Sequence, residues 1–197
     1  MNELRSICVF CGSGMGNHAR YREAAVAFGQ ILADERLALV YGGGSTGLMG
    51  VLADSVLEHD GKAIGIIPEA MTEREVQHRG LTELHIVDSM HTRKAMMARL
   101  SDAFVALPGG IGTLEELLEI TTWAQLGIHR KPIAILNLAG YYNPLLAMIQ
   151  QGVDAGFIRR LDPQLLQVAE GVADILPALR SAPPPDDRPK WLDLEQS

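Results

Sequence analysis

Residues 37–50 read Leu37-Ala38-Leu39-Val40-Tyr41-Gly42-Gly43-Gly44-Ser45-Thr46-Gly47-Leu48-Met49-Gly50. The apolar run at 37–41 predicts a buried β-strand, and the segment 47–59 predicts an α-helix. Between them, the glycines at 42, 44 and 47 satisfy G-x-G-x-x-G after a strand and at the opening of a helix. Such a turn exposes backbone N–H groups at the positive end of a helix, which favours binding of an anion.

The same alternation of strand and helix continues along the chain. Short apolar runs predict strands at 6–10, 62–67, 85–88, 103–107, 133–138 and 165–168, and helical periodicity predicts helices at 21–36, 90–100, 114–126, 143–155 and 172–179. This order is typical of a parallel sheet covered on both faces. We therefore predict a single-domain Rossmann-like α/β fold over residues 1–182, with a doubly wound parallel sheet and helices on both faces. The proline-rich segment 183–197 is expected to be an extended or disordered tail.

Composition limits the possible partners. A chain of 197 residues, 47% hydrophobic and 21% charged, is long and apolar enough to bury one sizeable core. The net charge of −7 argues against general nucleic-acid binding, because nothing neutralises a phosphate backbone at large. The first residues do not resemble a signal peptide, and no run approaches the ~20 apolar residues that cross a bilayer. We expect a cytoplasmic protein without nucleic-acid or membrane partners.

Cysteine and histidine give no sign of a metal or redox site. Cys8 and Cys11 form a C-x-x-C, but they lie in the predicted strand 6–10 and directly after it. On a strand this odd spacing sends the two sulfurs to opposite faces, so we expect two buried, small apolar side chains. The six histidines show no ligand spacing. We predict no structural or catalytic zinc.

Positive charges stand at an unusual place in the segment Ser89-Met90-His91-Thr92-Arg93-Lys94, which opens a predicted helix. Cations stabilise helix C-termini by roughly 0.3–1 kcal/mol and are unfavourable at N-termini. Local violations of this kind cluster at functional sites. Here His91, Arg93 and Lys94, together with the N–H groups of the helix start, would form an anion pocket. The alternative is a solvated charged turn that is paired with nearby acids.

Glycines also precede the next predicted helix, in Leu107-Pro108-Gly109-Gly110-Ile111-Gly112-Thr113-Leu114-Glu115-Glu116. Thr113 and Glu116 have the T-x-x-E spacing of a capping box, which by itself explains Glu116 as a structural residue. A third glycine-rich turn, Gly12-Ser13-Gly14-Met15-Gly16, follows the first strand. Glycines at these places allow the backbone to approach a ligand closely.

The glycine motif at 42–47 does not have the partners of a dinucleotide site. NAD binding would need an acid at the end of the next strand, about 20 residues on, for the ribose. Residues 62–68 contain none before Glu69, and no Gly-Lys-Ser/Thr completes a P-loop. A phosphate or nucleotide contact remains, whereas a nucleotide-dependent dehydrogenase is disfavoured.

Met90-His91-Thr92-Arg93-Lys94 and the segment 108–116 resemble the two signature motifs of the LONELY GUY family. Its members are cytokinin riboside 5'-monophosphate phosphoribohydrolases and related AMP nucleosidases. Residues 11–13 and 41–50 also fit the family pattern, and the resemblance spans roughly residues 5–180 in order. It implies hydrolysis of the N-glycosidic bond of a purine nucleoside 5'-monophosphate by a homodimer. Water is the second substrate, so no cofactor is implied.

The resemblance also implies the site residues. Arg93 and Glu116 match the family's essential pair and are the implied catalytic residues. The implied substrate-binding residues are Gly12, Ser13, Gly43, Gly44, Gly47, Glu75, Lys94, Gly110, Ile111, Gly112, Thr113, Leu114, Glu115 and Thr122.

The chemistry requires that the two motifs face one pocket. Glu116 would stabilise positive charge on the ribose and activate water. Arg93 would anchor the phosphate or stabilise the leaving group, and the sequence leaves both open. It also leaves open whether the base is adenine or an N6-prenylated adenine. An alternative function is a non-catalytic carrier of a nucleotide or a molybdopterin-type cofactor, which would need the glycine turns but not Arg93 with Glu116.

Overall fold

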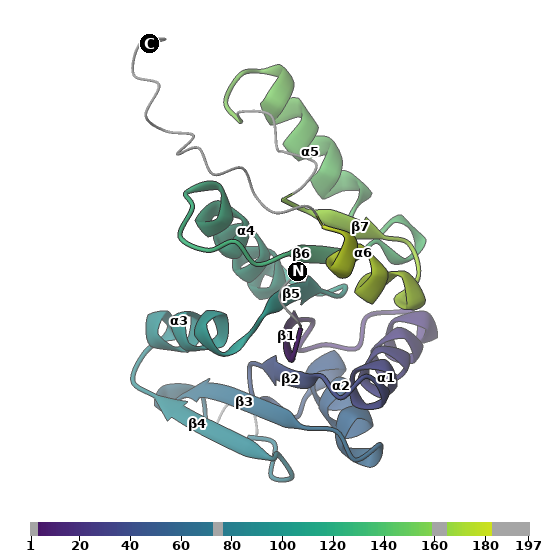
Figure 1. Ribbon diagram of the computed structural model, residues 1–197, viewed down its shortest axis with the longest axis vertical. Coiled ribbons are helices and arrows are strands. Elements are labelled where there is room, and N and C mark those ends of the chain that lie inside the picture. Colours follow the sequence, from purple (N-terminus) through teal and green to yellow (C-terminus); the bar gives the residue numbers. More distant parts are fainter. Residues whose placement is uncertain (1–3, 73–76, 159–164, 183–197) are drawn as a thin grey trace.

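The computed structural model describes residues 4–72, 77–158 and 165–182. Strands and helices alternate along the chain, as expected (Figure 1). The strands are β1 (Ser6–Phe10), β2 (Ala38–Tyr41), β3 (Ala63–Pro68), β4 (Glu83–Val87), β5 (Ala103–Ala106), β6 (Ile133–Leu136) and β7 (Gln167–Ala169). The α-helices are α1 (Ala19–Asp34), α2 (Gly47–Glu58), α3 (Met90–Leu100), α4 (Ile111–Gln125), α5 (Asn143–Asp154) and α6 (Ile175–Ser181).

All seven strands form one parallel sheet in the order β4-β3-β2-β1-β5-β6-β7. The chain runs outward from β1 to β4, then returns to the other side of β1 with β5. The order therefore reverses between β1 and β5. Loops that leave the carboxyl ends of these two strands diverge, and ligands of doubly wound sheets bind in the crevice at this point.

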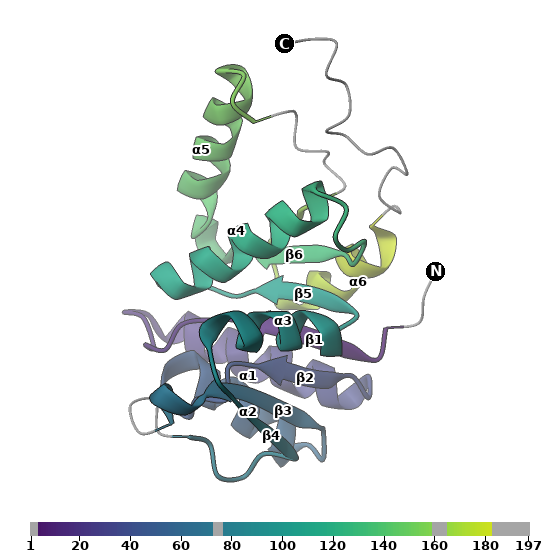
Figure 2. The ribbon, with the colours of Figure 1, turned by 90° about the vertical axis from the view of Figure 1, so that its left-hand side faces the viewer.

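Each face of the sheet has its own apolar core, so the predicted doubly wound α/β fold is confirmed. Helices α1, α2 and α6 cover one face, where Phe28, Leu32 and Leu52 are fully buried. Helices α3 and α4 cover the other face together with the start of α5 (Figure 2). Cys11 belongs to the first core and Cys8 to the second, so their predicted placement on opposite faces is confirmed. Burial raises the pKa of both thiols.

The strands and helices lie where the sequence predicts them, and the boundaries differ by a few residues at several strand and helix ends. The expected helix at 172–179 is a 3-10 turn, Val172–Asp174, followed by α6. A short 3-10 turn, Glu69–Met71, directly follows β3. Within the described residues, no helix is long and apolar enough to cross a membrane. The proposed tail at 183–197 lies outside the described residues.

Close packing of α1 on α2 depends on Gly29. A Cβ at this position would lie 2.7 Å from the Cβ of Ser55 and 2.9 Å from the carbonyl oxygen of Leu52. The Ser55 hydroxyl in turn donates a 2.7 Å hydrogen bond to the Val26 carbonyl of α1. The two helix backbones therefore approach each other where one of them has no side chain.

We predict that Gly29→Ala destabilises the protein by about 1–3 kcal/mol, because the added methyl overpacks this contact. Helix propensity alone predicts the opposite sign, a gain of roughly 1 kcal/mol. Urea unfolding measures the difference. Gly112→Ala is the matched control, since its Cβ would meet nothing within 4 Å. An unchanged midpoint for Gly29→Ala would contradict the packing assignment.

Candidate active site

Three glycine-rich turns come together at the carboxyl ends of β1, β2 and β5. The Gly12 N–H donates to the Pro108 carbonyl at 3.2 Å, and the Leu48 N–H donates to the Gly12 carbonyl at 2.9 Å. Gly47 adopts φ +60°, and a Cβ there would lie 2.2 Å from the Ser13 carbonyl. The turns predicted separately from the sequence are thus in direct contact at the switch point of the sheet.

Arg93 lies in the first turn of α3, and its side chain is only 7% exposed. Its Nε donates a 3.1 Å hydrogen bond to the Ile66 carbonyl of β3. The guanidinium passes directly over Gly42, where a Cβ would lie 1.9 Å from Nη2. The same Nη2 lies 3.8 Å from Oε1 of Glu116. Gly42 therefore provides the space through which Arg93 reaches α4.

Glu116 is not part of a helix cap, so the capping-box interpretation is wrong. Helix α4 begins at Ile111 with Gly110 as its N-cap, three residues before the predicted start. The glycines of this segment take part in the helix start, and the Leu114 N–H already donates to the Gly110 carbonyl at 3.1 Å. Thr113 is consequently a buried residue of the first turn, and Glu116 lies in the second turn with 12% of its side chain exposed.

Lys94 lies between two carboxylates of α4. Its Nζ is 2.5 Å from Oε1 of Glu115 and 2.9 Å from Oε1 of Glu119, and its side chain is 11% exposed. Burial alone would lower the pKa of Lys94, but the hydrogen bonds and charges of the two carboxylates outweigh it and raise the pKa. Lys94 therefore stays protonated and neutralises part of the acidic face of α4.

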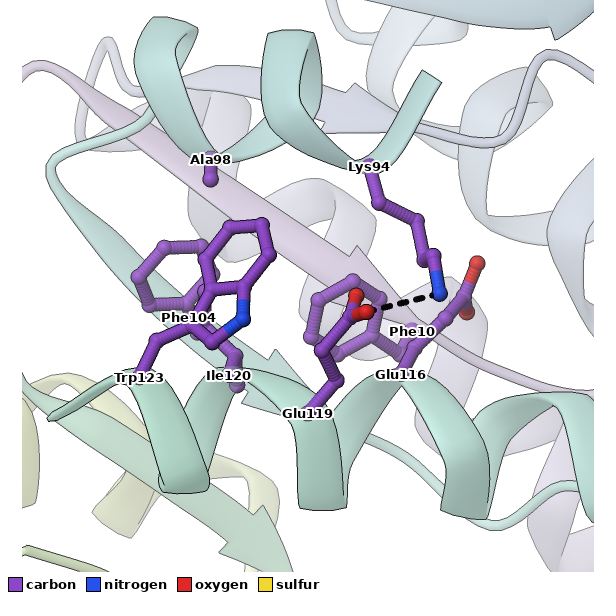
Figure 3. A pocket seen from close by; sticks show the side chains of 8 residues that line it. All are labelled: Phe10, Lys94, Ala98, Phe104, Glu116, Glu119, Ile120 and Trp123. Carbon is purple, nitrogen blue, oxygen red and sulfur yellow. Dashed lines mark hydrogen bonds and ion pairs between the residues drawn. The ribbon is translucent and has the colours of Figure 1, made fainter. Parts of the chain in front are cut away.

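A small pocket lies between α3 and α4 (Figure 3). Its polar end is formed by Lys94, Glu116 and Glu119, whose side chains converge from the two helices. The remaining lining is apolar and consists of Phe10, Ala98, Phe104, Ile120 and Trp123. Sequence reasoning missed Glu119 and Trp123. They follow Glu115 at steps of four residues, and this helical spacing predicts a shared face.

The other predicted substrate-binding residues have mixed surroundings. Gly110 and Gly112 have open space where a Cβ would stand, and Ile111 is exposed. Gly43 and Gly44 lie in the turn after β2, where the Gly43 carbonyl accepts a hydrogen bond from the N–H of His78.

Within α4, Leu114 packs against the second core, and the exposed Thr122 donates its hydroxyl to the Leu118 carbonyl. Glu75 lies outside the described residues.

Comparison with known proteins places the chain in a family. Residues 49–179 match a family described as possible lysine decarboxylase. The chain is 48% identical over 187 residues to a cytokinin riboside 5'-monophosphate phosphoribohydrolase of Arabidopsis thaliana, covering 94% of this chain and 86% of the relative. It is 51% identical over 170 residues to a probable enzyme of the same name from Oryza sativa, covering 86% and 76%. The chain belongs to the LONELY GUY family.

Solved structures with the same fold include proteins of a different description. The molybdenum cofactor carrier protein of Chlamydomonas reinhardtii superposes on this LONELY GUY protein with a TM-score of 0.67, covering 90% of this chain and 97% of the carrier, at 22% identity. The molybdenum cofactor binding protein of Rippkaea orientalis gives 0.65, covering 92% and 98%, at 19% identity. These likenesses concern the fold alone.

In this LONELY GUY protein we predict that Gly42→Ala displaces the Arg93 guanidinium, because the new methyl group occupies its path. The hydrogen bond to Ile66 should be lost, and stability should fall by about 1–3 kcal/mol. NMR measures the exchange of the Arg93 Nε–H with solvent, which the hydrogen bond to the Ile66 carbonyl slows. Gly14→Ala is the control, since its Cβ would meet nothing within 4 Å. If the Arg93 Nε–H of Gly42→Ala still exchanges slowly, the contact between position 42 and the Arg93 guanidinium is not tight.

Proposed function

We propose that this protein hydrolyses the N-glycosidic bond of purine nucleoside 5'-monophosphates to the free base and ribose 5-phosphate. The relatives' names supply the reaction class. The observation that carries the proposal is the approach of Arg93 to Glu116 across two helices, 3.8 Å apart and nearly buried. A protein that only carried a ligand would need the glycine turns but not this pair.

Glu116 is the proposed catalytic carboxylate. As the bond between the base nitrogen and the anomeric carbon breaks, the electron pair leaves with the base and positive charge develops on the ribose. A carboxylate near the anomeric carbon stabilises this charge and takes a proton from the attacking water. The water oxygen becomes the anomeric hydroxyl. The departing base nitrogen gains one proton and leaves as the neutral base, and this proton balances the one that Glu116 takes from the water.

Arg93 is proposed to orient Glu116 rather than to bind phosphate. Its Nε is engaged by the Ile66 carbonyl, and Nη2 points at the Glu116 carboxylate. Lys94 is likewise engaged by Glu115 and Glu119. A phosphate beside these carboxylates would be repelled, so it would bind instead at the N–H groups of the glycine turns and at the N-terminus of α4. Glu115, the more exposed partner of Lys94, is placed to contact the ribose hydroxyls.

Glu116→Gln tests the catalytic role. We expect release of adenine from AMP, and of the N6-isopentenyl base from its monophosphate, to fall by roughly 10²–10⁴-fold. The fold should be retained, with a lower unfolding midpoint because the buried Arg93 loses its charged partner. Chromatography of the released base is the measurement. Glu58→Gln, at the exposed end of α2, is the matched control and should keep full activity. Normal turnover by Glu116→Gln would refute the assignment, and wild-type binding without base release would favour the carrier function.

We further propose that the protein forms a homodimer through the region of α5. Leu145 and Leu146 at the start of this helix pack against the second core, but none of its twelve residues is fully buried against the described part of the chain. Met148 is 68% exposed, and Phe157 just beyond the helix is 90% exposed. Exposed apolar side chains that gather in one region mark interaction surfaces. Figure 2 shows α5 extending away from the sheet.

Replacing Met148 by Glu and Phe157 by Asp should convert the dimer to a monomer, because burying two charges at an apolar contact is costly. Sedimentation velocity measures the mass. Ile86→Glu on the edge strand β4 is the control, and it should leave the dimer intact. Monomeric wild-type protein at micromolar concentration, or a double variant that stays dimeric, would contradict this interface.

A further inference from the structure

Two consecutive tyrosines after β6 hold the glycine-rich turn that precedes α4. The Tyr141 hydroxyl donates to the Gly109 carbonyl, and the Tyr142 hydroxyl donates to the Leu107 carbonyl at 2.7 Å. The two carbonyls flank Pro108. Burial raises the pKa of Tyr142, so that its hydroxyl keeps the proton it donates. Neither tyrosine belongs to the implied catalytic or substrate-binding residues.

The segment that presents these tyrosines is fixed tightly. Asn137 accepts the Tyr142 N–H at its Oδ1 at 2.8 Å. Ala139 and Gly140 adopt φ +53° and +74°, and the left-handed conformation of Ala139 costs about 1–2 kcal/mol. The Tyr141 ring stands edge-on to Tyr142 and also to Tyr21 of α1, with centroids 5.1 and 5.9 Å away. The hydroxyl of Tyr141 therefore has a defined position.

The hydrogen bond from Tyr141 to the Gly109 carbonyl also orients the N–H of the same peptide, which belongs to Gly110. The peptide between Gly109 and Gly110 is trans, so the Gly110 N–H points opposite to the Gly109 carbonyl. With the carbonyl held by Tyr141, the N–H is directed away from Tyr141. Both residues are glycines, which impose little restriction on rotation of this peptide plane. Open space stands over Gly110, whose Cβ position has no atom within 4 Å.

We propose that Tyr141 is a positioning residue that keeps the Gly110 N–H turned toward the substrate phosphate. This proposal rests on the function proposed above. Without the hydroxyl, the Gly109–Gly110 peptide is free to flip, and a flipped peptide would present a carbonyl oxygen to the phosphate. Loss of a donor and gain of an acceptor both weaken binding of an anion.

Tyr141→Phe tests the proposal, because it removes only the hydroxyl. We expect KM for AMP and Kd for ribose 5-phosphate each to rise by roughly tenfold, the loss of one hydrogen bond to a charged group. The kcat should change less than about twofold, since the reacting groups on α3 and α4 are untouched. Steady-state kinetics and titration calorimetry provide the two measurements, and the unfolding midpoint confirms that the variant folds.

Tyr142→Phe is the matched control. It deletes the same atom from the neighbouring residue, but the peptide that follows the Leu107 carbonyl belongs to Pro108 and has no N–H. Because Tyr142 is buried, this variant should lower the unfolding midpoint while KM and Kd stay at wild-type values. A purely structural role of both tyrosines would instead change the midpoints and leave both affinities unaltered.

The outcomes separate the two proposals. If the wild-type protein binds ribose 5-phosphate but releases no base, the proposed function fails, and the comparison of Kd values still decides the role of Tyr141. The role of Tyr141 is refuted if Tyr141→Phe binds ribose 5-phosphate within twofold of wild type, or if both variants weaken it equally. It is also refuted if the wild-type protein binds neither ribose 5-phosphate nor inorganic phosphate.

Discussion

The buried guanidinium of Arg93 is the constraint on which the site depends. A charge that is 93% removed from solvent would be costly without partners, and here it has a carbonyl of β3 and a carboxylate of α4. Its path to Glu116 requires that the residue after β2 has no side chain. The Arg93 guanidinium thus links β3 and the residue after β2 to helices α3 and α4. A change in any of these four elements should affect the same pocket.

Charge is distributed unevenly between the two parts of the site. The facing sides of α3 and α4 contain two cations and three carboxylates in mutual contact, which suits a sugar that develops positive charge in the transition state. The glycine turns contribute backbone N–H groups and no acidic side chain, which suits a phosphate. Acidic side chains next to a phosphate site would repel the phosphate. This repulsion is avoided if the sugar binds between α3 and α4 and the phosphate binds at the glycine turns.

The fold alone does not explain this division, since the molybdenum cofactor carriers share the architecture at about 20% identity. Function is a property of the side chains placed on such a scaffold. In this chain the side chains proposed to carry the function lie at the contact between α3 and α4. In the proposal above, Tyr141 adds a second level of control, because its hydroxyl holds one peptide of a turn whose glycines restrict rotation little.

The sequence by itself determined the alternation of strands and helices, the parallel sheet, the opposite placement of Cys8 and Cys11, and the segments at which a site would form. These follow from local periodicity and from the short range of strand and turn preferences. Only the tertiary structure decided that Glu116 faces Arg93 instead of capping its helix, because helix starts depend on contacts with distant residues such as Gly12 near Gly109. The partners of Lys94 and Tyr141 are likewise 21 or more residues away in the sequence, and packing of the whole sheet brings them together.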